Sequence, residues 1–247
     1  MSGIRRRDVL AGTAFVLADI ELARGAIISG QLPWQPDKED TPRAAKPGAW
    51  KFFTADEAVM MAVLADRIIP PDPDTPGGND AGCVVFIDRQ LAGPYGLYEG
   101  LYERPPFIKG TLQQGPQSAQ TPATLYRLGI AALERYCSRP DGRAKGKPLA
   151  SLQAPEQDAI LEGLEDGSVE LEGVDGKTFF QQVVKDVQQG FFADPIYGGN
   201  RDMCAWKMIG FPGARYDYRE WVGRHNERYP HPPVSIGGRI EWTPRKS

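Results

Sequence analysis

The sequence predicts a mainly α-helical fold, organised as one irregular helical domain with long ordered loops and extended N- and C-terminal arms. Two observations support this prediction. Apolar residues recur at helical spacing in several separate stretches, and most of these stretches begin or end at a helix-boundary signal. The 247 residues also include 28 glycines and 22 prolines. Because these two residue types interrupt helices, we expect short helices joined by long connections.

A capping box predicts the start of the first helix. The Thr54 side chain can accept a hydrogen bond from the backbone of Glu57, whose carboxylate can reach back to Thr54. Pro70 ends this helix, because proline disfavours a helical residue before it. A second helix is expected over residues 83–91, where β-branched residues leave a strand as the alternative.

The later helices also begin at recognisable residues. Pro122 follows the capping residue Thr121, and proline is favoured at the first position of a helix. Pro155 opens another helix, which Gly167 closes, and a longer amphipathic helix begins at Gly176. Shorter helices are expected at residues 203–208 and 217–226.

Four segments are expected along the chain: a signal or N-terminal helix (1–30), an extended linker arm (31–50), the helical domain (51–215) and a C-terminal arm (216–247). Arg6 and Arg7 precede a short apolar stretch, an arrangement that resembles a twin-arginine export signal. The alternative is an amphipathic first helix with a basic tip. Trp34 suggests that the linker arm is pinned against a surface, because aromatic side chains rarely stay without a contact.

Several classes of protein and site are disfavoured by composition. The net charge of −3 disfavours binding to nucleic acid. The sequence contains no run of about 18 apolar residues, so a membrane span is not expected. Cys83, Cys137 and Cys204 lie far apart and form no C-x-x-C pair, and the two histidines, His225 and His231, both lie near the C-terminus. A zinc ribbon or a histidine-rich metal site is therefore disfavoured.

Clustered acidic residues are the remaining candidates for chemistry. Asp66, Asp72 and Asp74 lack the spacing of a calcium-binding loop, so we expect them to cap turns. The acidic residues between positions 156 and 172 are expected to face solvent. We therefore expect no catalytic, cofactor-binding or metal-binding residue in this chain.

Aromatic residues gather in two glycine- and proline-rich stretches, residues 93–120 and 190–213. Large aromatic side chains dominate many protein interfaces, and a long loop in a compact domain is usually functional. The alternative for residues 190–213 is a local aromatic core beneath a loop. The candidate residues for a partner interface are Trp34, Tyr95, Tyr98, Phe191, Phe192, Tyr197, Trp206 and Phe211.

Two blocks of sequence resemble the gluconate 2-dehydrogenase subunit 3 family. The first runs from Phe53 to Asp88 and contains DRIIP at residues 66–70. The second contains GFFADPIYGGN at residues 190–200 and WKMIGFPG at residues 206–213. A basic N-terminal stretch is also typical of the family. The aromatic loop at 93–120 and the tail after residue 215 depart from the family pattern.

The resemblance implies a non-catalytic small (gamma) subunit, which supports the folding, twin-arginine export and stability of a partner catalytic subunit. That partner would carry FAD, with an iron–sulfur cluster as a further candidate, and would pass electrons to a multihaem c-type cytochrome subunit carrying haem c. The complex would lie in the periplasm, attached to the cytoplasmic membrane. A buried interface of more than about 1,600 Å² is expected.

An interchain disulfide through Cys83, Cys137 or Cys204 is a further expectation after export. Two other functions compete with the small-subunit hypothesis. In the first, the chain is a free-standing periplasmic enzyme, such as a hydrolase with an Asp/Glu pair. In the second, it is a stand-alone helical binding module.

Overall fold

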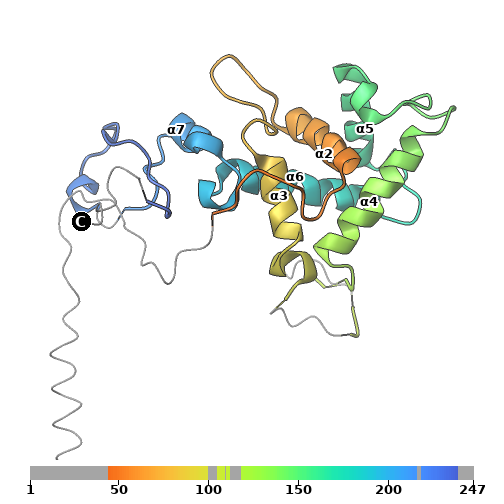
Figure 1. The fold of residues 1–247 in the computed structure, drawn as a ribbon, viewed down its shortest axis with the longest axis horizontal. Helices are drawn as coiled ribbons and strands as arrows, with labels where there is room; N and C mark the ends of the chain where they lie inside the picture. Colours follow the sequence, from red (N-terminus) through yellow and green to blue (C-terminus); the bar gives the residue numbers. More distant parts are fainter. Residues whose placement is uncertain (1–43, 100–104, 109, 112–117, 216–217, 239–247) are drawn as a thin grey trace, which may run out of the picture. The chain divides into compact units, whose positions relative to one another are not determined.

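A computed structural model describes residues 44–99, 105–108, 110–111, 118–215 and 218–238. Six α-helices and no strands occur among these residues, which confirms the predicted mainly α fold (Figure 1). The helices are α2 (Ala55–Ile68), α3 (Cys83–Leu91), α4 (Pro122–Cys137), α5 (Ala154–Asp166), α6 (Gly176–Phe192) and α7 (Cys204–Ile209).

The described residues fall into two units. The larger holds residues 44–214 and 227–238, and the smaller holds residues 215 and 218–226. All six α-helices belong to the larger unit, and the smaller contains the short 3-10 helix η6 (Arg219–Trp221). The predicted division at residues 30, 50 and 215 stays a prediction.

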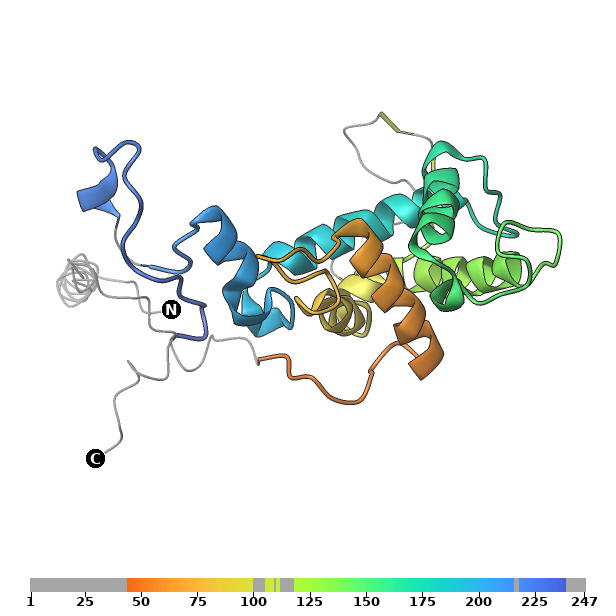
Figure 2. The same ribbon diagram turned by 90° about the horizontal axis from the view of Figure 1, so that it is seen from above.

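Helix α6 is the centre of the helical domain and packs against α2, α3, α4 and α5 (Figures 1 and 2). Its apolar side chains recur three or four residues apart, so they form one buried stripe along the helix. The ring of Phe179 meets the buried ring of Tyr126 on α4 edge to face, with 5.8 Å between the ring centroids. The buried stripe consists of Phe179, Phe180, Val183, Val187 and Phe191.

The predicted helix boundaries agree closely with the structure. The capping box forms: Glu57 N–H donates to Thr54 Oγ1 over 3.2 Å, and Thr54 N–H donates to Glu57 Oε2 over 2.7 Å. Helix α4 begins at Pro122, and Gly167 follows the last residue of α5. The region expected to be helical at 217–226 contains only the short η6 among its described residues.

Asp88 anchors the segment that leads into α2. Its fully buried carboxylate accepts hydrogen bonds from the backbone amides of Lys51, Phe52 and Phe53 at 2.9–3.1 Å. Arg89 pairs with the same carboxylate and donates to the Lys46 carbonyl over 3.1 Å. This pair of residues therefore fixes residues 46–53 against α3.

A second buried carboxylate, Asp186 on α6, joins three elements. It accepts hydrogen bonds from the hydroxyl of Tyr95, which lies in the 3-10 helix η1 (Pro94–Leu97), and from the hydroxyl of Tyr126 on α4, both at 2.9 Å. Gln182 donates to it over 2.9 Å. Burial raises the pKa of Asp186, although the three donated hydrogen bonds and the nearby Lys185 oppose that shift.

Asp186 is expected to make the protein less stable as pH rises from about 4. The folded state holds the carboxyl proton more tightly than the unfolded state does. Its contribution to stability is therefore complete below the unfolded pKa and is lost as pH rises through the raised folded pKa. The Asp186→Asn variant has no titratable carboxyl group at this position, so it lacks this pH dependence. Urea unfolding of both proteins between about pH 4 and pH 8 should show wild-type stability falling relative to the variant, and a constant difference would contradict this assignment.

Candidate interaction surface around helix α7

A tight turn at residues 198–200 sets the position of α7. Gly198 has a φ of +99° and Asn200 has a φ of +45°, so the chain reverses within three residues. The buried Asn200 side chain donates to the Ala193 carbonyl over 2.9 Å and accepts from the Ala205 amide over 2.9 Å. One amide side chain thus ties the first turn of α7 to the end of α6.

Trp206, a residue of α7, provides a second attachment between α7 and α6. The ring is buried, and Nε1–H donates to the Phe192 carbonyl over 2.9 Å. The ring of Phe211 packs against it edge to face at 5.0 Å. Trp206 therefore serves as an internal staple between α6 and α7.

Residues 233–237 of the C-terminal segment are fixed beside this region. Asp194 accepts hydrogen bonds from the Ser235 hydroxyl at 2.6 Å and the Ile236 amide at 2.7 Å. The Ala214 amide donates to the Val234 carbonyl over 2.7 Å, next to the isolated bridge between Gly213 and Val234.

Large apolar side chains remain exposed around Trp206. The exposed fractions are 44% for Phe192, 51% for Met208, 57% for Ile209 and 44% for Phe211. We call these four residues the α7 surface. Gathered apolar side chains that a protein leaves in water commonly mark an interaction site.

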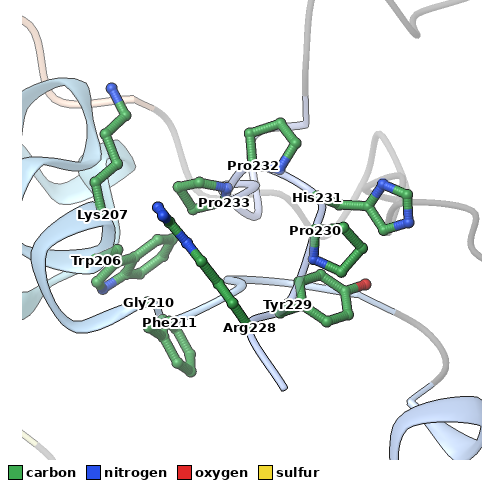
Figure 3. A pocket seen from close by; sticks show the side chains of 10 residues that line it. All are labelled: Trp206, Lys207, Gly210, Phe211, Arg228, Tyr229, Pro230, His231, Pro232 and Pro233. Atoms are coloured by element: carbon green, nitrogen blue, oxygen red, sulfur yellow. The ribbon is translucent and has the colours of Figure 1, made fainter. Parts of the chain in front are cut away.

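A pocket of about 580 Å³ adjoins the α7 surface (Figure 3). One wall comes from the end of α7 and the other from residues 228–233. None of the ten residues that line it is acidic, so the pocket suits an anionic group. Those residues are Trp206, Lys207, Gly210, Phe211, Arg228, Tyr229, Pro230, His231, Pro232 and Pro233.

A second pocket, of about 460 Å³, has a different character. Asp56 and Glu134 line it together with Val59 and Cys137. Burial raises the pKa of Cys137 to about 11, so this thiol is protonated near neutral pH and is a poor nucleophile. Across the described residues, no group of three or more metal-ligating side chains occurs.

The family model of gluconate 2-dehydrogenase subunit 3 matches residues 55–213. The chain belongs to the gluconate 2-dehydrogenase subunit 3 family. No curated protein and no solved structure matches it. The family match begins at the first residue of α2 and ends at Gly213, so the α7 surface lies within the subunit 3 region, whereas Arg228 and the prolines of the pocket lie beyond it.

The predicted interface residues of this subunit 3 protein fall into two groups. Phe192, Tyr197 and Phe211 are exposed, so they are available to a partner. Phe191 and Trp206 are buried within the chain itself. This burial agrees with the alternative given for residues 190–213, a local aromatic core. Their contact with a partner stays a prediction, and the proposals below rest on exposed side chains.

Other predicted residues have varied surroundings. Tyr95 is half-buried and bonded to Asp186, and Tyr98 is half-buried at the end of η1. The export-signal residues Arg6 and Arg7, and the interface candidate Trp34, lie outside the described residues.

The three cysteines differ in access. Cys83 and Cys137 are buried, and burial raises the pKa of Cys83 to about 12. Cys204 is half-buried, with its thiol 3.7 Å from Asn200 Oδ1. Because disulfide formation needs an accessible thiolate, Cys204 is the best placed of the three for the predicted interchain bridge, which stays a prediction.

Sequence reasoning missed Met208, Ile209, Lys207 and Arg228. The signal for the first two was available, because two adjacent apolar residues precede Gly210 in a very short helix. Asp72 caps a turn as expected, because its carboxylate accepts hydrogen bonds from the backbone amides of Asp74 and Thr75. Asp66 instead accepts from the amide of Asn79, 13 positions further along the chain. In the part of the chain that the structure describes, the helices are too short or too polar to cross a bilayer.

Proposed function

We propose that this chain is the non-catalytic small subunit of an FAD-dependent, gluconate 2-dehydrogenase-type complex. It supports the folding, export and stability of a catalytic subunit that carries FAD, with an iron–sulfur cluster as a further candidate. That subunit passes electrons to a multihaem c-type cytochrome subunit. The complex is periplasmic and attached to the cytoplasmic membrane, and Arg6 and Arg7 direct its export. Membership of the subunit 3 family supports this proposal.

The α7 surface is the observation that carries the proposal. Its four apolar side chains lie inside the family-matched region. Met208 and Ile209 are on α7, a helix of only six residues held in place by Asn200 and Trp206, whereas Phe192 ends α6 and Phe211 follows α7. Burying such side chains against another chain gains roughly 25 cal/mol for each Å² of apolar area. A rigidly presented apolar helix is therefore suited to docking on a partner.

Co-expression of this chain with the genes that neighbour its own tests the proposal. The tagged full-length chain should recover a yellow protein with the absorbance of bound FAD, in equal amounts of the two chains. If the tagged chain emerges alone and itself oxidises a sugar or sugar acid, the small-subunit proposal is wrong.

Ile209→Asp is expected to reduce recovery of the flavoprotein at least about tenfold, because it places a charge in the centre of the proposed contact. The stability of the chain should change little, since Ile209 is 57% exposed. Val59→Asp is the matched control, because Val59 is 55% exposed and lies on α2. Equal recovery with both variants would place the interface elsewhere.

A further inference from the structure

We propose that the pocket between α7 and residues 228–233 binds a carboxylate side chain of an acidic segment on the partner catalytic subunit. This inference rests on the proposed function and adds a second, electrostatic contact to the apolar α7 surface. It assigns the recognition to Lys207 and Arg228.

The charge of the pocket favours a carboxylate. Lys207 and Arg228 are exposed on opposite walls, and Figure 3 shows the Arg228 side chain pointing toward the α7 wall, where Lys207 and Trp206 lie. A guanidinium presents its N–H groups in a planar fork that matches the two oxygens of a carboxylate. Lys207 on the facing wall adds a second positive charge to the lining, and its side chain extends away from the Arg228 guanidinium (Figure 3).

The apolar walls strengthen this contact. Rings of Trp206, Phe211 and Tyr229 line the pocket, together with three prolines in the stretch 230–233. A bound carboxylate would be partly removed from water there, and charge pairs are stronger where the local dielectric is low. The volume of about 580 Å³ falls within the range of about 300–1,000 Å³ that is typical of binding pockets.

The proline-rich wall is anchored before any partner arrives. Ser235 and Ile236 bond to Asp194, and Val234 pairs with the chain beside Gly213. Prolines have a fixed φ, so this segment loses little conformational entropy when a ligand binds.

A partner segment fits the pocket better than a free small acid does. Phe211 belongs both to the pocket and to the α7 surface, and Lys207 directly precedes Met208 and Ile209. A small molecule would fill the pocket and leave those two apolar side chains in water. A peptide segment would cover both. This apolar contact is needed because exposed ion pairs alone contribute only about 1 kcal/mol or less.

Charge reversal in the co-expressed full-length chain tests the inference. Lys207→Glu with Arg228→Glu should lower recovery of the flavoprotein at least about tenfold, and wild-type recovery should fall in high salt. Arg139→Glu with Lys147→Glu is the matched control, because both residues are exposed and the charge change is the same. Circular dichroism melting checks folding, and Lys207→Gln with Arg228→Gln replaces the reversed pair if that pair does not fold.

The outcomes separate this inference from the proposed function. If wild type recovers no flavoprotein, both are wrong. If wild type and both double variants recover it equally, only the carboxylate contact is wrong. Sodium gluconate, titrated into the full chain with tryptophan fluorescence as the readout, probes the other source of a carboxylate. A saturable signal that the Lys207/Arg228 variant loses would assign the pocket to a free sugar acid and overturn the partner-segment inference.

Discussion

Replacing Asp88 with alanine is expected to lower the free energy of unfolding by about 4 kcal/mol. The carboxylate is fully buried and accepts hydrogen bonds from the amides of Lys51, Phe52 and Phe53, as well as pairing with Arg89. Alanine would leave these three amides, of which that of Phe53 is buried, without their acceptor. Urea unfolding followed by circular dichroism measures the loss. Asp88→Asn keeps one acceptor oxygen, so it should lose roughly half as much.

Asp158→Ala is the control for the Asp88 prediction. Asp158 also pairs with an arginine, Arg67, at 2.7 Å, but the two side chains are 39% and 26% exposed. Such a partly solvated pair should contribute about 1 kcal/mol or less. Similar losses for Asp158→Ala and Asp88→Ala would mean that the amides of residues 51–53 find other acceptors, and the proposed anchoring by Asp88 would be wrong.

The helix boundaries were predictable because their signals are local. The capping box of Thr54 and Glu57 spans three residues, and the proline at position 122 and the glycine at position 167 act on their immediate neighbours. Such short-range chemistry needs no knowledge of the fold. For this reason the helices predicted between residues 54 and 208 begin within about two residues of those observed. The helix predicted at 217–226, which had no such boundary signal, contains only the short η6 among its described residues.

The buried carboxylates were not predictable in this way. In the sequence Asp88 is only one residue of the helix expected over 83–91, yet the amides that donate to it lie 35–37 positions earlier in the chain. Asp186 likewise meets Tyr95 and Tyr126, which are 91 and 60 positions away. No sequence pattern at either aspartate indicates those distant donors.

The aromatic stretch at 190–213 was only partly interpretable for a similar reason. Its rings were predicted to contact a partner, but the sequence does not show which surface each ring covers. Helical phase places Phe191 inward and leaves Phe192 exposed, although the two are adjacent. The Trp206 side chain lies against the end of α6, where its indole N–H donates a hydrogen bond to the Phe192 carbonyl.

The stretch GFFADPIYGGN, at residues 190–200 of the family-matched region, therefore has a structural role in addition to any contact with a partner. Asp194 and Asn200 use their side chains to fix neighbouring backbone segments. These bonds hold the short helix α7 in one orientation. The exposed side chains of the α7 surface thus depend on the half-buried Asp194 and the buried Asn200, whose side chains fix the backbone around α7.

Gly199→Ala is expected to lower the free energy of unfolding by about 3 kcal/mol or more. A β-carbon at this position would lie 2.0 Å from the carbonyl oxygen of Gly190 and 2.8 Å from its carbonyl carbon. Both atoms belong to the backbone of α6, so relief requires a shift of the whole turn at 198–200. Thermal and urea unfolding measure the loss.

Gly48→Ala is the matched control, because a β-carbon at position 48 has no neighbour within 4 Å, and its effect should stay within about 0.5 kcal/mol. Since the 198–200 turn positions α7, Gly199→Ala should also reduce recovery of the flavoprotein at temperatures where the variant is still folded. Full recovery of the flavoprotein by a folded but destabilised Gly199→Ala protein would show that binding does not depend on the orientation of α7. The interface would then lie on surfaces outside the turn.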